Sequence, residues 1–94
     1  MRVRLTPRAH RDLEEIVQYL SDRSVPGARN VKRAFEATIN LIAHFPDSGR
    51  LAGEGDVRVL PVGRYPYLVY WTVEAGEAWI VHIRDGRRRP WRSA

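Results

Sequence analysis

The C-terminal part of the sequence concentrates side chains that could bind an anion. Residues 84–94 contain five arginines and one aspartate, a net charge of +4, whereas the whole chain of 94 residues carries +5. A guanidinium group is a planar fork that bonds two oxygens of a phosphate or a carboxylate at once. The segment therefore predicts contact with nucleic acid or with an acidic protein surface. The competing interpretation is a solvated terminal tail.

The arginines that follow the last predicted strand are the stronger candidates for such a site. A strand directly before them would fix the position of the first side chains, Gly86 allows the chain to turn, and Pro90 stiffens it. For the aromatic residue that follows the proline, packing on the chain's own sheet is the alternative to binding. We expect a target-binding segment that consists of Arg84, Arg87, Arg88, Arg89 and Trp91.

Other residues suit proton transfer or charge stabilisation less specifically. Histidine is the side chain best suited to act as a general base at neutral pH, and His82 lies in a predicted strand beside Arg84. A lone histidine in a strand is nevertheless more often structural. Arg58 and Arg64 flank an earlier predicted strand, where they could widen the cationic surface or form ordinary surface ion pairs.

Length and composition limit what else the chain could be. Ninety-four residues predict one domain with a modest core, and 44% hydrophobic residues with 10% aromatic residues indicate a folded chain. There is no cysteine, and the three histidines do not have the spacing of metal ligands. No apolar run approaches the length of a membrane span, and no signal-peptide pattern is present. We expect a cytoplasmic protein that uses no metal or cofactor and does not bind membranes.

Two amphipathic helices are predicted in the first half of the chain. The first runs from Pro7 to about Arg23, because threonine at position 6 is a good cap and proline suits the first helical position. Residues 24–27 interrupt the pattern, and the second helix runs to about Phe45, where Pro46 ends it. Apolar residues recur at helical spacing in both: Ala9, Leu13, Ile16, Val17 and Leu20, then Ala28, Val31, Phe35, Thr38 and Ile42.

The second half of the chain has the two-residue period of β-strands. Strands are predicted at residues 3–5, 57–62, 67–74 and 78–84, with a loop at 47–56 and a tight turn at Ala75-Gly76. The order of elements is therefore β-α-α-β-β-β. This order indicates an α+β domain in which a helical hairpin packs on one face of a small, mostly antiparallel sheet.

The second face of the predicted sheet also needs a cover. The strand at residues 67–74 has apolar side chains on both faces, and a helical hairpin covers only one. Either another part of the chain or a partner must cover part of the other face. In the last strand, strict alternation places Ile80, His82 and Arg84 together, and we expect this side to be the open one.

Four segments follow one another along nearly the whole chain: "VRLTPRAHRDLEEIVQYL", "FPDSGR", "VRVLPVGRYPYLVYW" and "IRDGRRRP". Together they resemble the ParE/RelE toxin superfamily, whose fold is a β-α-α-β-β-β unit. Its members are the toxins of bacterial type II toxin–antitoxin pairs, also called plasmid stabilisation proteins. The resemblance therefore implies a toxin that arrests growth when free and that a cognate antitoxin holds inactive.

The resemblance leaves two mechanisms open, and two residues favour one of them. RelE-like members cleave messenger RNA on the ribosome, whereas ParE-like members inhibit DNA gyrase. RelE-like nucleases have an arginine directly ahead of the central "LVY" motif, where this chain has Tyr67. They also have a tyrosine, or a histidine–tyrosine pair, some residues beyond the final basic cluster, where this chain has Trp91, whose indole N–H only donates. These differences favour the ParE-like branch and a protein that is not an enzyme.

The resemblance also implies the partners. We expect a small, acidic, ParD-like antitoxin in a toxin–antitoxin hetero-oligomer, and DNA gyrase as the target. Antitoxin contact is expected at apolar residues of the first helix and of the open sheet face: Leu13, Ile16, Val17, Leu20, Tyr70 and Ile80.

Two alternatives stay open at the level of sequence. In the RelE-like alternative the partner would be the ribosome with its messenger RNA, and the site would comprise Arg58, Arg64, His82, Arg84 and Arg88. The other alternative is a small nucleic-acid-binding module, for which binding to bare DNA or RNA would depend strongly on salt.

Overall fold

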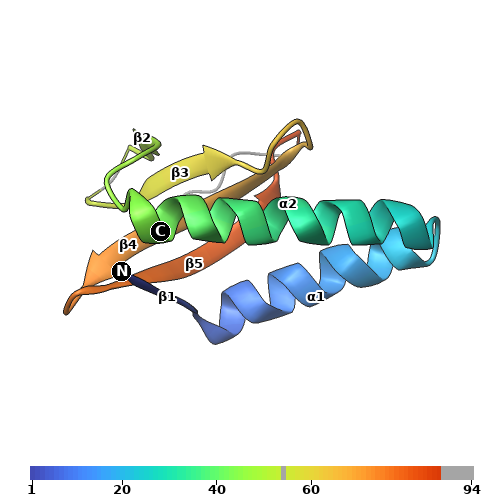
Figure 1. Ribbon diagram of the computed structural model, residues 1–94, viewed down its shortest axis with the longest axis horizontal. Coiled ribbons are helices and arrows are strands. Elements are labelled where there is room, and N and C mark those ends of the chain that lie inside the picture. Colours follow the sequence, from blue (N-terminus) through green and yellow to red (C-terminus); the bar gives the residue numbers. More distant parts are fainter. Residues whose placement is uncertain (54, 88–94) are drawn as a thin grey trace.

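Two antiparallel helices lie on one face of a five-stranded sheet (Figure 1). The computed structural model describes residues 1–53 and 55–87. The helices are α1 (Pro7–Ser21) and α2 (Val25–His44). The strands are β1 (Arg2–Leu5), β2 (Arg50–Leu51), β3 (Arg58–Pro61), β4 (Tyr67–Glu74) and β5 (Glu77–Asp85). The predicted α+β class and the helical hairpin on a sheet are confirmed.

The order of strands across the sheet is β1-β5-β4-β3-β2. The first and last strands of the chain pair in parallel, and every other neighbouring pair is antiparallel. The predicted elements all occur, but β2 falls in a segment that was expected to be a loop. It has two residues, which pair with Arg58 and Val59 of β3, and so short a strand has no alternation that a sequence pattern could reveal.

The start of each helix is fixed by a side-chain cap. The Thr6 hydroxyl accepts a hydrogen bond from the Ala9 N–H at 3.2 Å, and the Ser24 hydroxyl accepts one from the Gly27 N–H at 3.1 Å. A proline lies in the first turn of each helix, where its missing N–H costs nothing. The Thr6 cap fixes the start of α1 directly after β1 and thereby determines which part of α1 lies over β5.

The hydrophobic core lies between the helices and one face of the sheet. Trp71 at its centre is fully buried, and its indole N–H donates to the Pro46 carbonyl at 3.0 Å. The helices contribute Ala9, Val31, Phe35 and Ile42, the sheet contributes Tyr67, Val69, Trp71, Ala78, Ile80 and Ile83, and the residue after β3 contributes Val62.

A β-bulge in β5 changes which side chains share a face. Tyr70 lies opposite His82 but Trp71 lies opposite Ile80, so Val81 is an extra residue in β5. Ile80 consequently joins the core with 1% of its surface exposed, whereas His82 pairs with Tyr70 on the other face. The expectation that Ile80 shares the open face with His82 and Arg84 is wrong, because strict alternation does not anticipate an inserted residue.

The hairpin between β4 and β5 contains a residue in an unfavourable conformation. Ala75 and Gly76 have φ values of +51° and +76°, as a type I′ turn requires. Glycine adopts such values freely, but alanine does not, and asparagine tolerates them better.

We predict that Ala75→Asn stabilises the protein by about 0.5–1 kcal/mol, since Asn-Gly is the preferred type I′ sequence. Urea unfolding would measure the change. The matched control is Ala37→Asn on the exposed surface of α2, which should destabilise by about 0.5 kcal/mol through lower helix propensity. Equal effects of the two substitutions would contradict the assignment of strain to Ala75.

Candidate functional site

A cleft of about 390 Å³ lies between α1 and the C-terminal end of β5. One wall belongs to α1, and the other belongs to the ends of β4 and β5. Its lining residues are Asp12, Glu15, Ile16, Tyr19, Tyr67, His82, Ile83, Arg84, Asp85 and Arg87. The cleft thus contains two of the predicted target-binding arginines and the candidate histidine.

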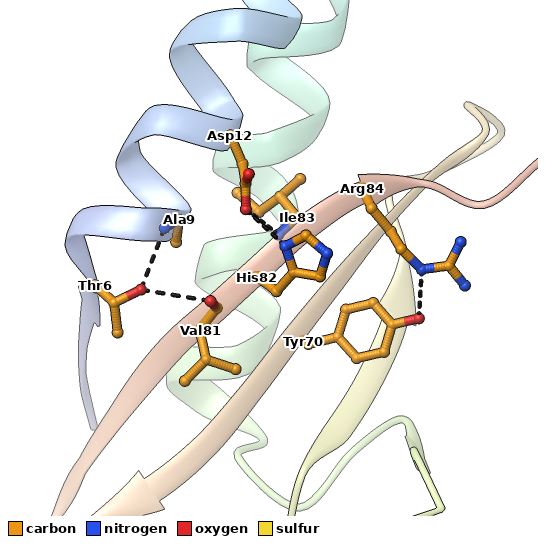
Figure 2. A network of polar contacts seen from close by, with 8 residues as sticks. All are labelled: Thr6, Ala9, Asp12, Tyr70, Val81, His82, Ile83 and Arg84. Carbon is orange, nitrogen blue, oxygen red and sulfur yellow. Dashed lines mark hydrogen bonds and ion pairs between the residues drawn. The ribbon is translucent and has the colours of Figure 1, made fainter. Parts of the chain in front are cut away.

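The cleft exists because β1 is shorter than β5. The parallel pairing ends at Leu5 and Ile80, and the chain then turns into α1. Beyond this point the side chain of Asp12, rather than a neighbouring strand, accepts a hydrogen bond from the edge of β5 (Figure 2). Its Oδ2 atom accepts the Ile83 N–H at 3.0 Å and lies 2.7 Å from Nδ1 of His82.

His82 connects this carboxylate to the rest of the sheet face. Since a carboxylate can only accept, the 2.7 Å contact places a proton on Nδ1. The ring stacks on Tyr70, with 5.8 Å between centroids, and the Tyr70 hydroxyl accepts from Nε of Arg84 at 2.9 Å (Figure 2). His82 is only 7% exposed, so the arrangement orients a buried imidazole rather than presenting it to solvent.

Asp85 holds the last described arginine at the mouth of the cleft. Its carboxylate accepts the backbone N–H of Arg87 at 2.9 Å, Nε–H at 3.0 Å and an Nη2–H at 2.7 Å. Hydrogen bonding to Asp85, and then its charge, raises the pKa of Arg87 above its ordinary value. The intervening Gly86 donates to the Pro66 carbonyl at 2.6 Å, and a Cβ there would lie 3.1 Å from Leu68 side-chain atoms. The turn is therefore anchored to the connection between β3 and β4.

Tyr67 forms part of the same wall, opposite Asp85 in the register of β4 and β5. Its side chain is also in contact distance of the Phe35 ring, with 6.0 Å between centroids. Burial, and then the charge of Asp85, raises the pKa of the phenol. Tyr67 therefore keeps its proton at physiological pH and acts as a wall of the core rather than as a general base.

The structure brings together some of the predicted site residues and separates others. Arg84, Arg87 and His82 all line the cleft. Arg58 lies opposite Trp71 in the register, on the face opposite to His82, and Arg64 is exposed in the connection between β3 and β4. Arg88, Arg89 and Trp91 lie outside the described residues.

The residues predicted to contact an antitoxin lie mostly inside the molecule. Leu13, Ile16 and Leu20 are half-buried and pack against the core, and Val17 is half-buried as well. Tyr70 is 5% exposed, and Ile80 belongs to the core. The large apolar side chains that the described surface does expose are Met1, Tyr19, Val25, Leu41, Phe45, Leu51 and Val73.

Sequence reasoning missed the two aspartates that organise the cleft. Asp12 stands three residues after Ala9 and four before Ile16, so it lies on the buried stripe of the helix. A charged residue on such a stripe indicates a hydrogen-bond donor nearby, because a buried charge without a partner is costly. In the sequence, Asp85 only lowers the net charge of a basic segment. Its hydrogen bonds to Arg87 depend on the turn after β5, which the sequence does not reveal.

Two general features of the described residues bear on the kind of site. Within residues 1–53 and 55–87, no group of three or more His, Cys, Asp or Glu side chains could hold a metal ion. Among the same residues, neither helix is long and apolar enough to cross a bilayer.

Comparison with known proteins identifies the family. Residues 3–90 match the family of the ParE toxin of the type II toxin–antitoxin system parDE. Among solved structures, the chain is similar to one described as the chromosomal ParDE TA system from P. aeruginosa. The TM-score is 0.69 at 21% identity, over 90% of this chain and 95% of that one. Curated proteins give no significant match. The chain belongs to the ParE toxin family.

We predict that Asp12→Ala lowers the free energy of unfolding by about 2 kcal/mol, because the Ile83 N–H and the His82 ring lose their common acceptor in a half-buried place. Glu14→Ala, which removes an exposed carboxylate from the same helix, should change it by less than about 0.5 kcal/mol. Denaturant unfolding of both variants would measure the difference. A loss no larger for Asp12 than for Glu14 would show that the carboxylate does not hold α1 to β5.

Proposed function

We propose that this chain is the toxin of a type II toxin–antitoxin pair, that a small acidic antitoxin neutralises it, and that the free protein inhibits DNA gyrase. The observation that carries the proposal is the match to the ParE toxin family over residues 3–90. The net charge of +5 supports an acidic partner. The protein would act in the cytoplasm, where DNA gyrase is found.

The proposed target surface is the cationic end of the chain, which consists of Arg84, Arg87, Arg88, Arg89 and Trp91. The geometry of the described part supports this choice, because Arg84 and Arg87 lie at one cleft and the side chain of Arg87 is 74% exposed. A guanidinium held at a fixed place on a surface loses little side-chain entropy when it binds.

The proposed antitoxin surface is apolar and lies on the helices. Tyr19 and Val25 at the turn between the helices, and Leu41 and Phe45 at the end of α2, are each at least 43% exposed. Burial of such side chains supplies lasting affinity, while opposite charge speeds association. Val17 of α1 is half-buried and stays in the proposed set, whereas Ile80 is left out because it lies in the core.

The RelE-like alternative has less support. It would need His82 as a proton-transfer group with Arg58 near it, but His82 is 7% exposed and Arg58 lies on the opposite face of the sheet. Tyr67 is buried in the wall of the cleft. We therefore propose inhibition by binding, without catalysis by this chain.

We predict that changing Arg87, Arg88 and Arg89 together to alanine raises the concentration that half-inhibits gyrase supercoiling by about tenfold or more, as expected for lost charge-assisted bonds. The same variant should no longer arrest growth but should still co-purify with the antitoxin. The control is the triple change Arg8→Ala, Arg11→Ala and Arg29→Ala, which removes the same charge from exposed helix surfaces.

Two results would count against this proposal. If both triple variants lose inhibition equally, net charge rather than position determines the effect. If the wild-type protein leaves supercoiling unchanged but cleaves messenger RNA on ribosomes, the RelE-like alternative is correct.

A further inference from the structure

An acidic residue lies at the start of the most basic segment of the chain. Asp85 is adjacent to Arg84 and two residues before Arg87, and its side chain is 17% exposed. If the segment acted only through its total positive charge, a carboxylate there would weaken it. The contacts of Asp85 indicate a different role.

The hydrogen bonds of Arg87 leave a defined part of its guanidinium available. Asp85 takes Nε–H and one Nη2–H, which form one edge of the planar group. The other edge, formed by Nη1 and Nη2, has the spacing that matches the two oxygens of a carboxylate. The side chain is 74% exposed, and among residues 1–53 and 55–87 no hydrogen bond to this second edge occurs, so it can receive a partner's carboxylate.

Asp85 also contacts the second arginine of the cleft. Its backbone carbonyl accepts from Nη1 of Arg84 at 3.2 Å, while Nε of Arg84 donates to the Tyr70 hydroxyl. One residue therefore helps to orient two guanidinium groups along the same wall. The anchor of Gly86 on the Pro66 carbonyl fixes the turn that carries them.

The walls of the cleft favour a protein carboxylate over a nucleic-acid backbone. The α1 wall carries Asp12 and Glu15, which repel any anion but repel a chain of phosphates more than a single carboxylate, because the repulsion grows with the number of charges brought near. The same wall carries Ile16 and Tyr19, which suit the apolar stem and neighbours of a glutamate side chain. A cleft of about 390 Å³ is large enough for one or two side chains of a partner.

We propose that Asp85 is a positioning residue that holds Arg87, and with it Arg84, to receive a glutamate or aspartate carboxylate of a protein partner at the α1–β5 cleft. The inference deepens the proposed function, because the partner there is the protein target. Removing the negative charge of Asp85 should thus weaken binding of an anion, whereas simple charge attraction predicts that it strengthens binding.

The test uses the full chain labelled with ¹⁵N and a short glutamate-rich peptide as the probe. The Nε–Hε signal of Arg87 should shift on titration of the wild-type protein. Asp85→Asn should lower the affinity for the peptide by about fivefold or more, since an unrestrained arginine must be ordered on binding. Asp47→Asn makes the same change of charge at an exposed site outside the cleft, and it should raise the affinity for the peptide slightly or leave that affinity unchanged.

Two further variants separate positioning from a merely structural role. In an Arg87→Ala background, Asp85→Asn should have no further effect on peptide affinity. Arg87→Lys keeps the charge at an exposed position but lacks the fork, and it should lose affinity about as much as Asp85→Asn. This second variant keeps the test valid even if Asp85→Asn does not fold.

The proposal is overturned if Asp85→Asn binds the peptide more tightly than the wild type, or if the Arg87 signal does not respond to it. Tighter binding of a single-stranded oligonucleotide of equal charge at the same residues would overturn it in favour of phosphate. A gyrase supercoiling assay on the same proteins is a separate arm. If the peptide results hold and gyrase is unaffected, the carboxylate site stands and the proposed target is wrong.

Discussion

The carboxylate of Asp12 is the contact on which the cleft depends. A strand that continues past its neighbour leaves backbone N–H groups without strand acceptors. Under a helix, water cannot easily supply the missing acceptors. Asp12 provides the Ile83 N–H with an acceptor from α1 and binds His82 with the same oxygen. His82 stacks on Tyr70, and the Tyr70 hydroxyl accepts a hydrogen bond from Nε of Arg84. The Asp12 side chain thus holds α1 to the edge of β5, and a series of contacts through His82 and Tyr70 connects it to Arg84.

The cationic end differs from a solvated tail in how its described charges are held. Arg84 and Arg87 each spend part of their guanidinium on groups of the chain itself, and both use Asp85. Total charge governs how fast an acidic partner arrives, but fixed donors govern which arrangement of oxygens it must present. The family comparison and the geometry therefore complement each other: the first gives the class of protein, and the second gives the chemistry of one surface.

Sequence patterns predicted the fold because most of it follows from local signals. The Thr6 and Ser24 caps, the helical stripes and the alternation of β4 are all visible in short windows of sequence. The bulge at Val81 is not, because it depends on how two strands align, and it moved Ile80 from the expected open face into the core. Charge predicted Arg84 and Arg87 as site residues. Sequence did not reveal the contacts of Asp12 and Asp85, which form only where α1, β5 and the turn after β5 meet.

The parallel pairing of β1 with β5 affects folding during synthesis of the chain. Arg2 pairs with Glu77, so the sheet joins segments about 75 residues apart, and such distant contacts form late in folding. The strand β5 lies between β1 and β4 and also carries the bonds to Asp12. A polypeptide whose synthesis stops before Glu77 lacks the strand with which β1, β4 and α1 all form contacts. Chains that terminate before β5 would accordingly be unfolded substrates for proteases.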